Sequence, residues 1–190
     1  MHDIEPYFNW REWYVASEDE DSPLAGRDNS EFEFTHTIYN YYIHPQWDEF
    51  GSSTLYLKIL YVDYEAQFAI IEFIGEWNDC LYNDIMYLKE NILDLMIQKG
   101  ICKFVFICEN VLNFHGSDDC YYEAIHEDIV DEGGWMVMLN LLEHVEDEMR
   151  RTYLQAYVNM FNDVDWRRQK PQFLEKTIEN LLSGKTLELN

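Results

Sequence analysis

The stretch KFVFICENVLNFHGSDD, residues 103–119, decides the fold expected of this chain. It opens with β-branched and aromatic residues, which are typical of a buried strand, and it closes in a polar Gly-Ser-Asp-Asp turn. A helical pattern follows, so a small loop is expected between the carboxyl end of a strand and the amino end of a helix. Open α/β sheets tend to hold their sites at such places. The candidate site is therefore this loop, with Asn113, His115, Gly116, Ser117, Asp118 and Asp119.

Upstream of this stretch, the apolar pattern changes from alternating to helical. Residues 54–63 alternate and residues 67–74 form a second apolar run, which Gly75 is expected to end, so a β-hairpin is predicted. The face of the first strand would hold Leu55, Leu57, Ile59 and Tyr61. Residues 79–99 have helical spacing, with Asn78 or Asp79 as the cap. The expected inward stripe is Leu81, Ile85, Leu88, Ile92 and Leu95.

Downstream, helices and strands are expected to alternate. After a strand at 102–107, we predict a helix at 117–132 with Tyr121, Tyr122, Ile125 and Ile129 inward. A strand at 135–141 and a long helix at 143–161 follow. The long helix would bury Val145, Met149, Tyr153, Ala156 and Met160. Pro171 is expected at the first position of a last amphipathic helix, which would bury Phe173, Leu174, Ile178, Leu181 and Leu182.

The element order predicts an α/β fold with a mixed sheet of about four to five strands. The sheet would start with the β-hairpin and continue through β-α crossovers, which give it a parallel portion. Three regions are expected: an acidic, aromatic-rich arm at 1–52, an α/β domain at 53–162, and a linker with an amphipathic helix at 163–190. Within the arm, one short strand or helix is expected around 32–42.

Charge and composition limit the partners. The formal net charge of −24 opposes binding to nucleic acid, which needs clustered Lys and Arg, and to anionic membranes. It suits a basic protein partner, but it also suits plain solubility. No signal peptide and no apolar run of about 18 residues is present, so the cytoplasm is the expected location. The four cysteines show no C-x-x-C pairing and are expected to be reduced thiols.

Over roughly residues 67–154, the pattern resembles the STAS domain, the fold of bacterial anti-sigma-factor antagonists. Gly75-Glu76 matches the Gly-Glu that follows the first strand of the family, and 103–107 with Val111 and Phe114 is similar to its central strand. The run Gly133-Gly134-Trp135-Met136-Val137 is similar to its Gly-Gly-strand landmark. The resemblance implies a STAS-like fold, regulation through protein–protein contacts and no intrinsic catalysis.

The loop departs from the family pattern. STAS loops usually carry an Asp-Ser-Ser-Gly type sequence, whose first Ser accepts phosphate from a partner kinase. Here His115 stands in place of the Asp and Gly116 in place of that Ser, which leaves Ser117 as the only hydroxyl. Ser117 would either cap the helix that follows or be modified or contacted by a partner.

Catalysis and metal binding have little support in the sequence. His115, Ser117 and Asp119 are the residue types of a nucleophilic site, but residues so close along the chain rarely converge as a triad. No spacing matches a zinc or calcium site, and no nucleotide motif is present. We therefore expect no metal and no cofactor.

The aromatic residues of the arm are the second candidate surface. Tyr7, Phe8, Trp10, Trp13 and Tyr14 would either pack against the domain or form an interface with a partner or a second copy of the chain. The expected function is non-enzymatic regulation or scaffolding through protein contacts, with a regulatory kinase or the chain itself as the partner. The alternatives are a small apolar ligand bound between arm and sheet, and an enzyme that uses His115 and the nearby acids.

Overall fold

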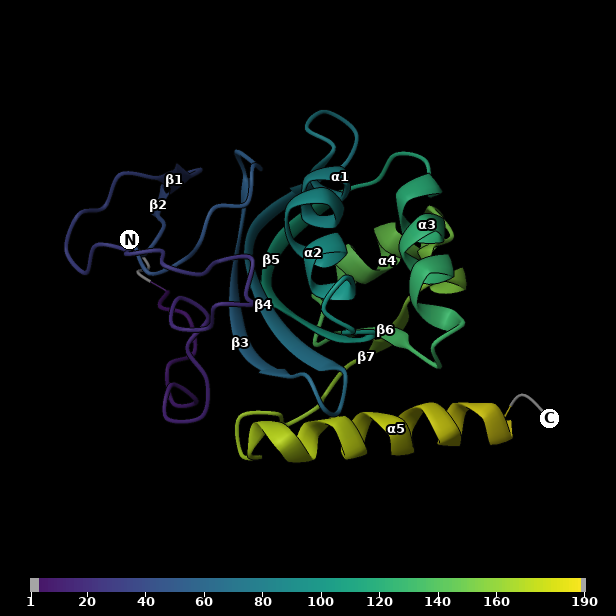
Figure 1. Cartoon of the computed structure of the whole chain (residues 1–190). Coiled ribbons are helices and arrows are strands. Elements are labelled where there is room, and N and C mark those ends of the chain that lie inside the picture. The colour runs from purple at the N-terminus through teal and green to yellow at the C-terminus, as the bar shows by residue number, and fades with distance from the viewer. Residues whose placement is uncertain (1–3, 189–190) are drawn as a thin grey trace.

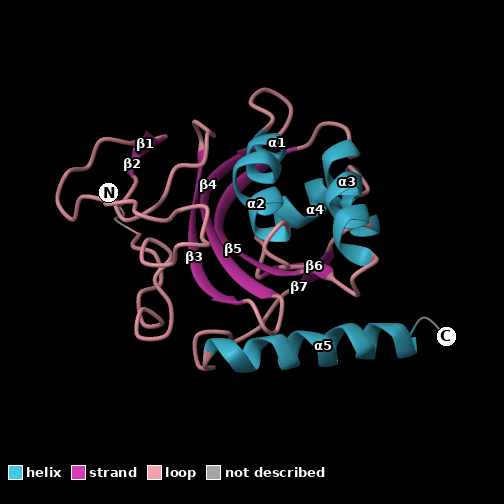
Figure 2. Cartoon of the chain, in the orientation of Figure 1, coloured by secondary structure: helices cyan, strands magenta, loops and turns pink. Residues whose placement is uncertain are grey.

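The computed structural model describes residues 4–188 and shows a five-stranded sheet between two layers (Figure 1). Short helices cover one face of the sheet, and one long helix crosses the other (Figure 2). The strands are β1 (Thr37–Ile38), β2 (Tyr41–Tyr42), β3 (Leu55–Asp63), β4 (Phe68–Asn78), β5 (Lys103–His115), β6 (Trp135–Leu139) and β7 (Asn159–Phe161). The helices are α1 (Asp84–Leu88), η1 (Lys89–Leu93), α2 (Asp94–Ile97), α3 (Cys120–Val130), α4 (Glu143–Arg151), η2 (Leu154–Ala156) and α5 (Pro171–Glu188).

The sheet has the strand order β3-β4-β5-β6-β7, so each strand lies beside its neighbour in sequence. β3 and β4 are antiparallel, and the three later pairs are parallel. Because the crossovers all advance in one direction, their helices lie on one face of the sheet. The expected mixed sheet with an opening hairpin and β-α crossovers is confirmed.

Alternation along the strands divides the apolar residues between two cores. Phe104 and Phe106 of β5 pack under the short helices, while Val105 and Ile107 pack on the opposite face with α5. In β3, a register shift between Ile59 and Tyr61 interrupts this alternation. Leu55, Leu57 and Ile59 share one face as predicted, but Tyr61 packs with the core under α5, so its predicted side was wrong.

The helix predicted at 79–99 begins later and has a different buried face. Asn83 has a left-handed backbone (φ 54°), α1 starts at Asp84, and η1 is a π-helical turn. The wider turn changes which residues face the sheet. Leu81 and Leu95 are 75% and 41% exposed, and their predicted burial was wrong. Ile85, Leu88 and Ile92 are buried as expected, together with Leu93 and Met96.

The prediction of one helix at 143–161 was wrong for the second half of this range. α4 ends at Arg151, because Tyr153 has a left-handed backbone (φ 63°) that no α-helix accommodates. After the 3₁₀ turn η2, β7 pairs with β6 and forms an edge of the sheet. Tyr153 is exposed, as is Ala156, whereas Val145, Met149 and Met160 are buried as expected.

The arm and the last helix pack on the sheet. Within 32–42 the arm forms two strands of two residues each, and Asp48 makes an isolated antiparallel bridge to Leu57 of β3. α5 starts at Pro171 as predicted. Its Leu174 and Ile178 are fully buried and Leu181 and Leu182 are half-buried, but Phe173 is 58% exposed, so its predicted burial was wrong.

Candidate functional site

The candidate site lies where β4 and β5 end side by side. The parallel register of these strands brings Asn78 opposite His115. The backbone N–H groups of Asp79 and Cys80 both donate to the His115 carbonyl, at 2.9 and 3.2 Å. The segment after β4 therefore lies against the start of the predicted loop, as the upper part of Figure 1 shows.

Asn113 and His115 belong to β5 and not to the loop, so the prediction that the strand ends at 107 was wrong. β5 is thirteen residues long, because its pairing with β4 continues through two register shifts. Asn113 Nδ2 donates to Tyr39 Oη at 2.8 Å, and His115 Nε2 lies 2.8 Å from Glu76 Oε1. Tyr39 in turn donates to Glu76 Oε2 at 2.9 Å, so this end of the strand is tied to the arm.

The loop itself contains the exposed Ser117 and Asp118, which follow a tightly packed Gly116. A Cβ built on Gly116 would lie 2.5 Å from Thr152 Cγ2, so only glycine fits at this approach to the end of α4. The chain thus places the loop against Thr152, which Tyr153 follows in sequence.

Ser117 does not cap the helix, and that expectation was wrong. α3 starts at Cys120, its N-cap residue is Asp119, and no side chain makes a capping hydrogen bond. Asp118 Oδ1 accepts from the Cys120 backbone N–H at 3.3 Å, and hydrogen bonds to Cys120 lower the pKa of Asp118. Ser117 is therefore exposed and not used by the fold.

The three groups of the hypothetical nucleophilic site have separate surroundings. His115 pairs with Glu76, and Asp119 Oδ2 accepts from Tyr157 Oη at 3.0 Å. Within residues 4–188, Ser117 Oγ makes no hydrogen bond to either of them. Neither His115 nor Asp119 is placed to act as the base for the Ser117 hydroxyl.

Beneath the surface, Asp79 connects three elements. Its Oδ1 accepts from Trp77 Nε1 at 3.0 Å and from the Ile85 N–H at 2.9 Å, and its Oδ2 accepts from Tyr122 Oη at 2.8 Å. Burial raises the pKa of Asp79 to about 6, against these hydrogen bonds. The carboxyl joins β4, α1 and α3, and so holds the base of the candidate surface.

Asp84, the second buried carboxyl, has one oxygen without a partner. Oδ2 accepts from the Asn78 N–H at 2.8 Å, while the buried Oδ1 makes no hydrogen bond to any described residue. Burial raises the pKa of Asp84. Over residues 4–188, no group of three His, Cys, Asp or Glu side chains is placed to hold a metal ion.

Exposed apolar residues follow both places where the chain contacts the loop, and sequence reasoning missed them. Leu81 and Tyr82 come directly after Cys80, whose N–H donates to the His115 carbonyl, and Tyr153 follows Thr152, which Gly116 approaches. Leu81 is 75%, Tyr82 46% and Tyr153 72% exposed. Helical spacing predicted Leu81 and Tyr153 inside, and only the left-handed residues that interrupt the helices place them at the surface. With Ser117 and Asp118 they form what we call the loop-end surface.

The predicted aromatic surface of the arm is divided between core and solvent. Trp10 is 2% exposed, and its ring and that of Tyr7 pack edge-to-face on Trp166, at 5.3 and 4.8 Å between ring centroids. Tyr14 is half-buried and donates to Asp19 Oδ2 at 2.8 Å. Phe8 and Trp13 are 55% and 40% exposed, so only these two remain available as contacts.

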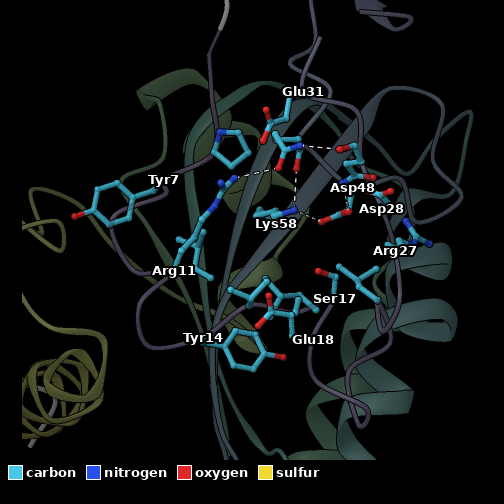
Figure 3. A pocket seen from close by; sticks show the side chains of 18 residues that line it. Tyr7, Arg11, Tyr14, Ser17, Glu18, Arg27, Asp28, Glu31, Asp48 and Lys58 are labelled. Atoms are coloured by element: carbon cyan, nitrogen blue, oxygen red, sulfur yellow. Dashed lines mark hydrogen bonds and ion pairs between the residues drawn. The ribbon is translucent and has the colours of Figure 1, made fainter. Parts of the chain in front are cut away.

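Among the hollows between the arm and the sheet, two differ in the chemistry of their walls. A pocket of about 300 Å³, drawn in Figure 3, has charged walls that include Arg11, Lys58 and Asp48. An apolar hollow of about 200 Å³ is lined by Ile38 and Ile43 of the arm region and by Ile74 of β4. The alternative function weighed from the sequence needs an apolar pocket in this region, and only the smaller of these two hollows is apolar.

Three solved structures resemble this fold. A protein of Thermotoga maritima described as an anti-sigma factor antagonist, TM1081, is 17% identical, covers 57% of this chain and 87% of its own, and has a TM-score of 0.44. The anti-sigma factor antagonist SpoIIAA in its unphosphorylated form is 13% identical, covers 67% of this chain and 96% of its own, and has a TM-score of 0.48. The NMR structure of TM1081 is 18% identical, covers 71% of this chain and 98% of its own, and has a TM-score of 0.43.

The similarity to these structures is one of fold. No protein-family model and no curated protein sequence matches the chain. None of the helices in the described part of the chain combines the length and the hydropathy that a membrane span requires.

Proposed function

We propose that the chain is a regulatory or scaffolding protein that acts without catalysis, by binding a protein partner through the loop-end surface. The observation that carries this proposal is that Leu81, Tyr82 and Tyr153 are exposed in the two segments that contact the loop of the exposed Ser117 and Asp118. Large apolar side chains that the fold leaves exposed near one loop favour a contact surface there.

The charge of the chain indicates the chemistry of the partner. The chain has a net charge of −24, and on α3 beside the loop Glu123, Glu127 and Asp128 are exposed. A partner with an apolar centre and a Lys- or Arg-rich rim would complement this surface, and its association would weaken with salt. Modification of Ser117 by a partner kinase and pairing with a second copy of the chain stay predictions.

The test compares capture of partners by matched variants. Leu81→Ser and Asp118→Lys are expected to lose a protein that the unmodified chain captures from its native host, and to bind the purified partner at least tenfold more weakly. Phe173→Ser is the control, because Phe173 is also exposed but lies on α5. If the unmodified chain and the three variants capture the partner equally, the loop-end surface is not the binding surface.

The apolar hollow supports a second candidate function, binding of a small apolar ligand. Its volume of about 200 Å³ and its walls of Ile38, Ile43 and Ile74 suit a short hydrocarbon group. Native mass spectrometry of the purified chain would show a retained apolar molecule that Ile43→Ser releases. A mass that fits the chain alone would argue against this candidate.

A further inference from the structure

The charged pocket of Figure 3 is separate from the loop-end surface and has features of a ligand site. It lies between two parts of the arm, at 6–31 and 46–48, and the outer strand β3. Its volume is about 300 Å³. That volume is at the lower end of the range typical of small-molecule sites.

An ion pair that is mostly buried forms the floor. Lys58 Nζ lies 2.9 Å from Asp48 Oδ2 and donates to the Gln46 carbonyl at 2.9 Å. Asp48 is 2% exposed, and its Oδ2 takes part in the ion pair without a hydrogen bond from any described residue. An ammonium group has three N–H donors, so Lys58 retains one donor that the described residues do not use.

Two arginines at the rim lack acidic partners, which is unusual in so acidic a chain. Arg11 donates to Gln46 Oε1 at 3.1 Å, and Arg27 donates to the Glu49 carbonyl. Within residues 4–188, neither guanidinium lies within 4.0 Å of a carboxylate, although the chain has 37 acidic residues and only 13 Lys and Arg. Together with Lys58, they offer free donors for an anionic group.

Carboxylates without partners line the same pocket. Glu18, Asp28 and Glu31 face it, and in the described part of the chain their side chains make no hydrogen bond and no ion pair. Figure 3 shows Glu31 near Arg11 and Glu18 on the opposite side, next to Ser17 and Tyr14. Free acceptors and free donors therefore surround one small volume.

The mixture of signs selects the class of ligand. An anion alone would be repelled by the acidic residues, and a cation alone by Arg11, Arg27 and Lys58. A molecule that carries both charges satisfies both sets, and the ring of Tyr14 and the side chain of Leu24 offer apolar contact. We propose that the charged pocket binds a small zwitterion of the amino-acid type, with its carboxylate on Arg11 and Lys58 and its ammonium on the free carboxylates.

The test is calorimetric titration of the full chain with the common amino acids, each compared with its N-acetyl and amide derivatives. At least one free amino acid is expected to bind, and blocking either charged end should weaken binding tenfold or more. Arg11→Gln and Glu31→Gln should each weaken it about tenfold, because both side chains are exposed and contribute little to the fold. Arg168→Gln is the control, since Arg168 is exposed and does not line the pocket.

Three results would overturn the proposal. The first is absence of heat from every amino acid at millimolar concentration while the chain is folded. The second is equal binding of free and capped forms. The third is binding of inorganic phosphate as tightly as any amino acid, which would make the pocket a plain anion site.

Discussion

At the scale of single residues, Glu72 shows how the sheet holds the arm. It is 1% exposed in β4, and its Oε2 accepts from the backbone N–H of Tyr7 at 2.8 Å. Arg167 lies 4.0 Å from its Oε1, and Glu109 is the nearby acid. Burial raises the pKa of Glu72 to about 7, because the partial ion pair and the hydrogen bond only partly replace water.

A pH dependence of stability follows from Glu72. Between the ordinary pKa of a glutamate and about 7, the folded chain binds more protons than the unfolded chain, so its free energy of unfolding falls as pH rises. Glu72→Gln should make the free energy of unfolding fall less steeply between about pH 5 and pH 8. It should also stabilise the chain at pH 8, by a few kcal/mol at most, because one pKa unit corresponds to about 1.4 kcal/mol. Urea unfolding at both pH values measures it.

Two comparisons make this measurement decisive. Asp79, whose pKa is raised to about 6, acts in the same direction and leaves part of the slope in the Glu72→Gln variant. Glu143→Gln is the control, because Glu143 is exposed on α4. If Glu72→Gln and Glu143→Gln keep the same slope as the unmodified chain, Glu72 is not the group responsible.

At the scale of elements, apolar spacing predicted which segments are helices and strands better than it predicted their ends. α5 starts at Pro171 as expected, and β3 and β4 form the expected hairpin. The errors occur where one residue changes the backbone geometry, as at Asn83 and Tyr153, both of which have positive φ. Such residues reverse which neighbours are buried without changing the apolar pattern of the sequence.

The buried side of α5 gives a second prediction. Leu174→Ala and Ile178→Ala should each reduce the free energy of unfolding by about 2–5 kcal/mol, because both side chains are fully buried against the sheet. Phe173→Ala should change it by less than about 0.5 kcal/mol, since the ring is 58% exposed. Chemical denaturation compares the three variants, and a large loss in Phe173→Ala would contradict the observed face of α5.

At the scale of the whole molecule, both ends of the chain close over one face of the sheet. Trp10 of the arm packs on Trp166, which precedes α5, and Trp10 Nε1 donates to the Gln169 carbonyl at 3.2 Å. Arg167 stacks over Trp166 at 4.2 Å and pairs with Glu109 of β5. The arm is thus part of a core that residues more than 150 positions apart build together.

The third prediction tests this closure. Trp10→Ala should reduce stability by about 3–5 kcal/mol and should speed tryptic cleavage after Arg11 and Arg27, because the arm loses its buried anchor. Trp13→Ala is the matched control: this ring is in the same segment but is 40% exposed. Limited proteolysis followed by mass spectrometry measures both, and equal cleavage of the two variants would show that Trp10 does not hold the arm.

The class of fold follows from patterns along the chain. The alternating runs before residue 75 and the helical stripes after it are local patterns, and a chain with this order buries its apolar faces as a mixed sheet with helices. The same patterns placed the loop at Gly116 to Asp119 between a strand and a helix. Fold class and the position of this loop could therefore be predicted, because both depend on periodicity along the chain.

The other features arise from contacts between distant parts of the folded chain. The tertiary structure extended β5 to His115 through pairing with β4, formed β7 from three residues through pairing with β6, and joined the two ends of the chain around Trp166. It also turned Leu81 and Tyr153 to the surface and brought Arg11 and Lys58 to one pocket. These features come from contacts between residues distant in sequence, and periodicity along the chain carries no information about such contacts.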